Sequence, residues 1–153
     1  MKKIALFPGS FDPFTAGHLD ILKRALTLFE RVIVGIGINP DKEAFLDNQK
    51  KIQFIQQATA SWGDRVQVLE YEGLTVELCR RYGIRHMVRG VRNSQDFEME
   101  KKLAEANREL APEIETLLML TNPQYAHISS TAARELIKNN GDASAYLPEG
   151  VRL

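Results

Sequence analysis

The first 29 residues contain a short apolar segment, then a polar segment, then apolar residues at the spacing of one helix face. Ile4–Phe7 is apolar at every position, which is typical of a strand buried on both faces in a parallel sheet. Apolar residues then recur at the spacing of one helix face, at Leu19, Leu22, Leu26 and Phe29. Residues 8–18 between them are therefore predicted to form a strand-to-helix turn, with Gly17 and His18 opening the helix.

The same alternation of short apolar runs and helical segments continues along the chain. Further strands are predicted at 31–38, 66–69, 86–88 and 116–120, and helices at about 47–61, 75–82, 94–110 and from 129 onward. A turn of helix is also expected near 143–147. Five buried strands that alternate with helices indicate a doubly wound α/β domain with a five-stranded parallel sheet, Rossmann-like in organisation. We expect one domain over residues 1–153.

Composition restricts the partners of such a domain. The 153 residues are 44% hydrophobic and 26% charged, which is typical of a soluble globular protein. Lys plus Arg and Asp plus Glu number 20 each, which argues against non-specific binding to nucleic acid or to anionic membranes. One cysteine and three scattered histidines predict neither a disulfide nor a protein metal site. With no signal-peptide core and no run long enough to span a bilayer, we expect a cytoplasmic protein.

Polar, glycine and cationic residues follow each predicted strand. They are the loop 8–18, Lys42, Thr75, Arg89–Arg92 and residues 125–131. Right-handed crossovers bring the carboxyl ends of parallel strands to one edge, where ligands bind in open sheets. Free backbone N–H groups at helix N-termini and paired arginine donors both suit phosphate. This edge is therefore predicted to hold a nucleotide phosphate site, although each segment taken alone is also compatible with an ordinary loop or helix cap.

A specific motif strengthens this interpretation. Gly9–Pro13 followed by Thr15–His18 resembles the signature of nucleotidyltransferases that carry a (His/Thr)-x-Gly-His motif. Over residues 4–148 the chain resembles the phosphopantetheine adenylyltransferase family. The loop motif is shared by the wider superfamily, whereas the combination of Arg89-Gly90-Val91-Arg92 with Asp96-Phe97-Glu98-Met99-Glu100 is more specific to this family. Within that pattern Ser10 replaces a more usual Thr, and Thr75 replaces a common apolar residue. Residues 45–51 lack the usual Thr-x-Glu-Glu-Arg, so helix capping is expected to pass to Asp47.

The resemblance implies a reaction in which ATP and 4′-phosphopantetheine give dephospho-coenzyme A and pyrophosphate, by direct in-line attack on the α-phosphate. It also implies Mg²⁺ bound with ATP, and a homohexamer. Two alternatives stay open. One is another adenylyl- or cytidylyltransferase of the same superfamily, with nicotinamide mononucleotide or a choline-type phosphate as acceptor. The other is a nucleotide sensor that does not turn over.

The resemblance also assigns site residues. His18 is expected to stabilise the transition state, and phosphopantetheine is expected to contact Ser10, Lys42, Thr75 and Arg89. No residue is predicted to hold a metal ion directly. The ATP contacts of the family carry over to Ser10, Phe11, His18, Gly90, Val91, Arg92, Glu100, Tyr125, Ala126, His127, Ile128, Ser129, Ser130 and Thr131.

Overall fold

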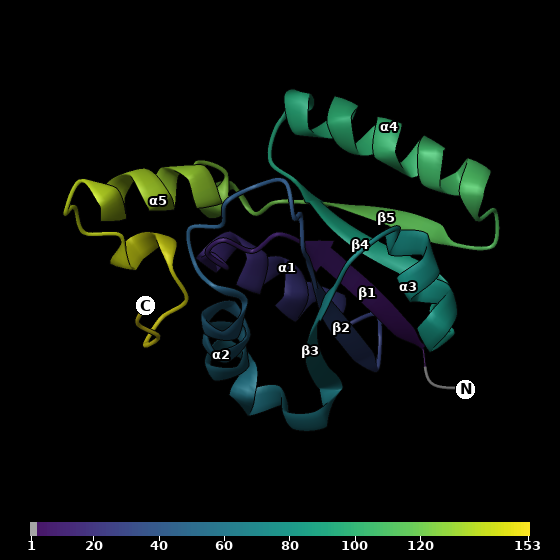
Figure 1. Ribbon diagram of the computed structural model, residues 1–153, viewed down its shortest axis with the longest axis horizontal. Helices are drawn as coiled ribbons and strands as arrows, with labels where there is room; N and C mark the ends of the chain where they lie inside the picture. Colours follow the sequence, from purple (N-terminus) through teal and green to yellow (C-terminus); the bar gives the residue numbers. More distant parts are fainter. Residues whose placement is uncertain (1–2) are drawn as a thin grey trace.

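A single five-stranded sheet organises the computed structural model, which describes residues 3–153 (Figure 1). All five strands run parallel in the order β3-β2-β1-β4-β5, which confirms the predicted doubly wound α/β fold. The elements are β1 (Ile4–Gly9), α1 (Ala16–Ala25), β2 (Arg31–Gly37), α2 (Asn48–Thr59), β3 (Val66–Tyr71), α3 (Thr75–Tyr82), β4 (His86–Val91), α4 (Ser94–Leu110), β5 (Glu115–Leu120) and α5 (Ser130–Lys138), with 3-10 turns at Ala60–Arg65, Pro123–Tyr125 and Ser144–Tyr146.

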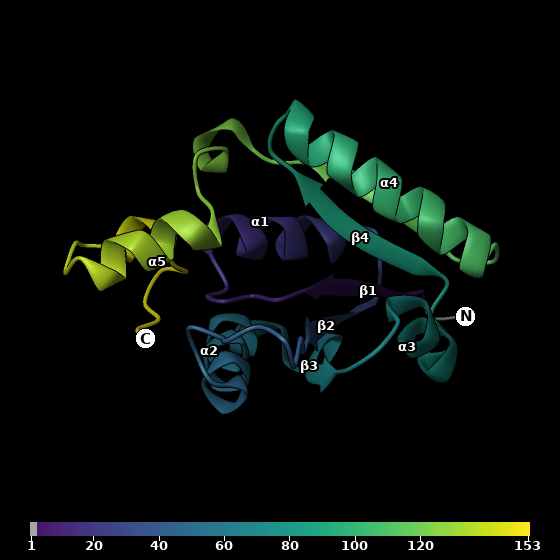
Figure 2. The ribbon, with the colours of Figure 1, turned by 45° about the horizontal axis from the view of Figure 1, so that its top comes forward.

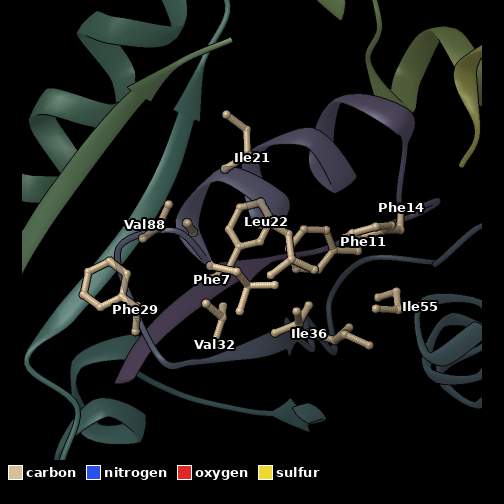
Figure 3. Packing of buried hydrophobic residues seen from close by; sticks show 14 of the residues in the cluster. Phe7, Phe11, Phe14, Ile21, Leu22, Phe29, Val32, Ile36, Ile55 and Val88 are labelled. Carbon is tan, nitrogen blue, oxygen red and sulfur yellow. The ribbon is translucent and has the colours of Figure 1, made fainter. Parts of the chain in front are cut away.

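Helices cover both faces of the sheet because successive strand residues point to opposite sides. Phe7 of β1 lies in the cluster that includes α1 and α2, and Figure 3 shows Leu22 of α1 beside it. Leu6, one position earlier, lies in the opposite cluster with Val76 and Cys79 of α3. In the views of Figures 1 and 2, α2, α5 and the C-terminus lie at one end of the molecule.

The apolar runs predicted the strands well and their degree of burial less well. The inner strands β1 and β2 are buried along their centres, as expected. The outer strands β3 and β5 are only half-buried, because each has a sheet neighbour on one side alone. Of the residues expected near 143–147, only the 3-10 turn Ser144–Tyr146 is helical. Within residues 3–153, no helix has the length and apolar character needed to cross a membrane.

Strands β1 and β4 separate toward their carboxyl ends. β1 pairs with β4 only at Ala5↔His86 and Leu6↔Met87, whereas β1 pairs with β2 along its whole length. The strand order also reverses at β1, since the chain builds β2 and β3 on one side of it and β4 and β5 on the other. In open α/β sheets such a switch point opens a crevice that binds ligands. The fold therefore prepares a site between the ends of β1 and β4.

Candidate active site

A hollow of about 460 Å³, called here the central hollow, lies over the separated ends of β1 and β4. Most of the predicted ATP contacts line it, which brings together residues far apart in the sequence. Those lining residues are Ser10, Phe11, His18, Gly90, Arg92, Glu100, Tyr125, Ile128, Ser129, Ser130 and Thr131, joined by Arg89 from the predicted acceptor contacts. Within the described residues 3–153, Val91, Ala126 and His127 lie outside the lining of this hollow.

His18 is fixed at the start of α1 by a reciprocal cap. The helix begins at Ala16, with Thr15 as the N-cap rather than Gly17 as its opening residue. The backbone N–H of Thr15 donates to His18 Nδ1 at 3.0 Å, and the backbone N–H of His18 donates to Thr15 Oγ1 at 3.2 Å. Because Nδ1 accepts a hydrogen bond, the ring proton of a neutral imidazole must lie on Nε2. The cap thus leaves the Nε2–H as the donor for a ligand.

The surroundings of His18 keep its ring uncharged. The rings of Phe7, Phe11 and Phe14 surround it, with centroid distances of 6.2, 5.0 and 5.5 Å. Burial lowers the pKa of His18 from 6.5 to about 3, and the positive charges of Arg89 and Arg92 act in the same direction. At neutral pH His18 is therefore a neutral hydrogen-bond donor in a site whose positive charge comes from arginine.

This protonation state is directly measurable in the ligand-free protein. We expect the ring nitrogens of His18 to keep the chemical shifts of a neutral Nε2–H imidazole from pH 8 down to pH 5, because its pKa lies below that range. The measurement is a nitrogen-15 NMR titration, with the His18 signals assigned by their loss in His18→Gln. A His18 titration midpoint near the ordinary value of about 6.5 would contradict the proposed environment.

The loop before His18 depends on a close backbone approach at Gly9. A Cβ atom at Gly9 would come within 2.9 Å of the Phe11 ring. Phe11 itself has a positive φ of 46° and is buried in the aromatic cluster beside His18. The missing side chain at Gly9 thus lets the Phe11 ring fold back under the loop and form part of the wall around His18.

An ion pair forms another part of the lining of the central hollow. Glu100 of α4 is buried and accepts two hydrogen bonds from the guanidinium of Arg89, from Nε at 2.8 Å and from Nη2 at 2.6 Å. Arg89 Nη1 donates to the carbonyl of Pro8, so this side chain bridges the gap between β4 and β1. Two residues predicted as separate contacts, one for the acceptor and one for ATP, are therefore joined to each other.

Arg92 links β4, α4 and the segment before α5. Its Nε donates to Asp96 Oδ2 at 2.9 Å, and its Nη1 donates to the carbonyl of Ile128 at 3.3 Å. Burial alone raises the pKa of Asp96, but hydrogen bonds from Arg92 and the charges of Arg92 and Arg89 outweigh it and hold the pKa below its ordinary value. The Arg92 guanidinium is thus held at the edge of the hollow by a charged partner.

The hydroxyl residues at the start of α5, Ser129, Ser130 and Thr131, differ in their contacts. Ser129 is the N-cap, and its Oγ accepts from the backbone N–H of Ala132 at 3.0 Å. The Ser130 hydroxyl donates to the carbonyl of Pro13 at 2.8 Å, which joins α5 to the loop after β1. All three residues line the central hollow. The free N–H groups of this helix start, together with its dipole, therefore face a space suited to phosphate.

The predicted acceptor contacts are divided among three neighbouring spaces. Ser10 and Arg89 line the central hollow. Arg89 also borders a small pocket of about 170 Å³ with Thr75, whose hydroxyl is hydrogen-bonded to that of Tyr71 at 2.9 Å. Lys42 lies in neither space. It lines a further hollow of about 820 Å³ that also includes Ser10, called here the basic hollow.

Asp12 positions the loop that carries Lys42, a role that sequence reasoning missed. Its carboxylate accepts hydrogen bonds from the backbone N–H of Phe45 at 2.7 Å and of Leu46 at 2.8 Å. Its carbonyl accepts from Arg134 of α5 at 2.8 Å. Asp12 stands inside the quoted motif, but its partners lie 33 or more positions away, so local spacing gives no signal for these contacts.

The acidic residues around the central hollow do not form a metal cage. Among residues 3–153 there is no cluster of three His, Cys, Asp or Glu side chains able to hold an ion. Asp96 and Glu100 are each paired with an arginine, and the Asp12 carboxylate accepts two backbone N–H groups. Mg²⁺ commonly keeps several waters and binds through substrate phosphates, which is compatible with this arrangement.

The chain is similar to known proteins along almost its whole length. Residues 6–136 match the model of the cytidylyltransferase-like family. The chain is 44% identical over 153 residues to a phosphopantetheine adenylyltransferase of Flavobacterium psychrophilum, covering 100% of this chain and 99% of that protein. It is 46% identical over 149 residues to a phosphopantetheine adenylyltransferase of Porphyromonas gingivalis, covering 97% and 96%.

A solved structure shows the same fold at much lower sequence identity. It is that of a bifunctional NMN adenylyltransferase/ADP ribose pyrophosphatase from Francisella tularensis, with a TM-score of 0.75 and 19% identity. The match covers 97% of this chain and 46% of that longer chain. At this identity the similarity is one of fold alone.

Proposed function

Since the chain belongs to the phosphopantetheine adenylyltransferase family of cytidylyltransferase-like proteins, we propose that it transfers the adenylyl group of ATP to 4′-phosphopantetheine. The products are dephospho-coenzyme A and pyrophosphate. The observation that carries the proposal is the central hollow, where His18, Arg89, Arg92 and the start of α5 meet over the ends of β1 and β4. This set of donors fits two phosphate groups that must be held together.

The chemistry needs positioning and charge stabilisation rather than a protein nucleophile. An oxygen of the acceptor phosphate forms a bond to the α-phosphorus of ATP. The bond from that phosphorus to the bridging oxygen breaks, and the electron pair leaves with pyrophosphate. The Nε2–H of His18 donates to an oxygen on the α-phosphate as charge develops there, and it needs no proton transfer to do so.

We infer that Arg89 guides the acceptor. It borders both the central hollow and the small pocket that contains Thr75. An acceptor whose organic arm lies in the small pocket would present its phosphate to Arg89 and Ser10, next to the α-phosphate. The helix start at Ser129–Thr131 and Arg92 would hold the phosphates that leave. Lys42 would reach the reacting phosphates from the loop that Asp12 anchors.

We also propose that Mg²⁺ binds together with ATP and would add positive charge to the triphosphate. The carboxylates of Asp96 and Glu100 are already paired with arginines, which fits an ion that would be held through phosphate oxygens and water.

We also propose that the chain assembles as a homohexamer. What supports an assembly is the group of exposed apolar side chains on α4 and the edge strand β5. Met99 is 64% exposed, Leu110 51% and Leu120 72%. Exposed apolar residues on a helix and on an edge strand are typical of surfaces that bind further protein.

The proposed reaction is tested by measuring pyrophosphate release from Mg-ATP with different acceptors. We expect release with 4′-phosphopantetheine and at least about a hundredfold less with nicotinamide mononucleotide or phosphocholine, because Arg89 and the small pocket select both a phosphate and its organic arm. Preference for another acceptor would mean that this protein has a different nucleotidyltransferase activity of the same superfamily. Tight ATP binding without release for any acceptor would favour the sensor alternative.

A further inference from the structure

The basic hollow carries more cationic than acidic side chains. It lies between α5, the loop after β2 and α2, elements that are found at the same end of the molecule in Figures 1 and 2. Lys42, Lys51, Arg134 and Lys138 line it, against two acidic residues, Asp12 and Glu43. The Asp12 carboxylate is already hydrogen-bonded to the backbone of the loop.

Lys51 differs from the other cations of this hollow because it is buried. It is 4% exposed, on the first turns of α2. Among the described residues 3–153 its Nζ has no hydrogen bond and no ion pair, whereas every fully buried side-chain nitrogen or oxygen there has a partner. The ammonium therefore ends at accessible space, and the space that Lys51 lines is the basic hollow.

Within the described residues 3–153, the Lys51 side chain is enclosed by protein along its length and reaches solvent only at the hollow, so an anion that enters the hollow can pair with its ammonium. The protein provides the Lys51 ammonium, and its anionic partner would come from a bound ligand. The ligand that fits is an anion with several acceptor oxygens, since the hydroxyls of Ser10 and Thr131 line the same hollow, as does Ser130, whose own hydroxyl is bound to the Pro13 carbonyl.

The location of these three residues connects the two hollows. Ser10, Ser130 and Thr131 line both the central hollow and the basic hollow. A chain of phosphate groups bound at the start of α5 can therefore continue past Ser10 toward Lys51 without leaving the protein surface.

We propose that Lys51 is a phosphate ligand and that the basic hollow receives a phosphate group of the bound substrates. The inference rests on the proposed function, because it takes phosphates in the central hollow as its starting point. Two phosphate sources share this chemistry. One is the diphosphate end of ATP, which leaves as pyrophosphate, and the other is the phosphomonoester of the acceptor.

The test compares Lys51→Met with Lys50→Met. Both substitutions remove one positive charge from neighbouring positions of α2, but Lys50 is exposed and lies outside the lining of the basic hollow. Binding of inorganic pyrophosphate and of 4′-phosphopantetheine is measured separately by calorimetry, without turnover. We expect Lys51→Met to weaken one of the two ligands at least about tenfold, and Lys50→Met to change both by less than about twofold. Loss of pyrophosphate affinity would show that the basic hollow receives the diphosphate end of ATP. Loss of phosphopantetheine affinity would show that it receives the phosphate of the acceptor.

Thermal unfolding separates a ligand-binding role from a structural one. Because Lys51→Met removes a cation that has no partner in the part of the chain that the structure describes and keeps an unbranched side chain of similar length, we expect its melting temperature without ligand to be no lower than that of the unmodified chain. Lys51→Arg keeps the charge and should keep most of the affinity, which provides a second variant if the methionine variant does not fold. Equal affinities of Lys51→Met and Lys50→Met for both ligands would overturn the proposal. Since binding is measured without catalysis, the result is independent of whether the adenylyl transfer itself is observed.

Discussion

Replacement of His18 by alanine is expected to lower the turnover number of adenylyl transfer at least about a hundredfold. The loss of one donor aimed at a developing charge typically removes about 3–4 kcal/mol of transition-state stabilisation. His18 is such a donor because its Nδ1 is occupied by the Thr15 N–H and its Nε2–H remains free for the α-phosphate. The measurement is the steady-state rate of pyrophosphate release at saturating ATP and 4′-phosphopantetheine.

The matched control is His86→Ala. His86 begins β4 and therefore lies at the amino end of the strand, at the edge of the sheet opposite the central hollow. The His86→Ala variant should therefore have a turnover number within about twofold of that of the unmodified chain. The fold of His18→Ala should persist, since the Thr15 side chain still accepts from the backbone N–H of residue 18. A folded His18→Ala variant with turnover within about threefold of the control would remove His18 from the mechanism.

Replacement of Arg89 by methionine should affect stability and activity together. The change leaves the buried carboxylate of Glu100 without its bidentate partner, for which a loss of about 3 kcal/mol in the free energy of unfolding is expected. Turnover should fall by at least about a hundredfold as well, because the guanidinium that faces both the central hollow and the small pocket is gone. Urea denaturation and the same rate assay measure the two effects.

A double replacement distinguishes the two roles of Arg89. In Arg89→Met/Glu100→Leu both charges are removed, so most of the lost stability should return while turnover stays low. The exposed pair Arg80–Glu113 serves as the control, since breaking it by Arg80→Met should leave the free energy of unfolding almost unchanged. Recovery of turnover in the double variant would show that the pair is a structural element alone.

The local pattern of the chain predicted most of the fold. Five apolar runs became the five strands, and Asp47 caps α2 as expected, with its side chain accepting from the N–H of Lys50 at 2.8 Å. The burial of the outer strands was overestimated, because an apolar run does not reveal whether a strand has one sheet neighbour or two. The comparisons confirm the family resemblance that the motifs from Gly9 to His18 and from Arg89 to Glu100 first indicated.

The site was predicted as a list of residues rather than as an arrangement. The pairing of Arg89 with Glu100 depends on how α4 packs over β4, and a separation of 11 residues carries no periodic signal for it. Arg89 lines the central hollow and Lys42 lines the basic hollow. This separation depends on two features without a local sequence signal: the β1–β4 pairing ends early, and Asp12 holds the loop that carries Lys42. Lys51 resembles any helix lysine in sequence, and only its burial beside a hollow distinguishes it.

The central claim is that two phosphates meet in the central hollow and react in one displacement, with His18 and the arginines as donors. The stereochemistry at the α-phosphorus of a chiral ATP analogue tests it most directly. A single attack by the acceptor phosphate predicts inversion of configuration in the adenylyl product. Retention would show two successive displacements through an intermediate on the protein, and would contradict the account.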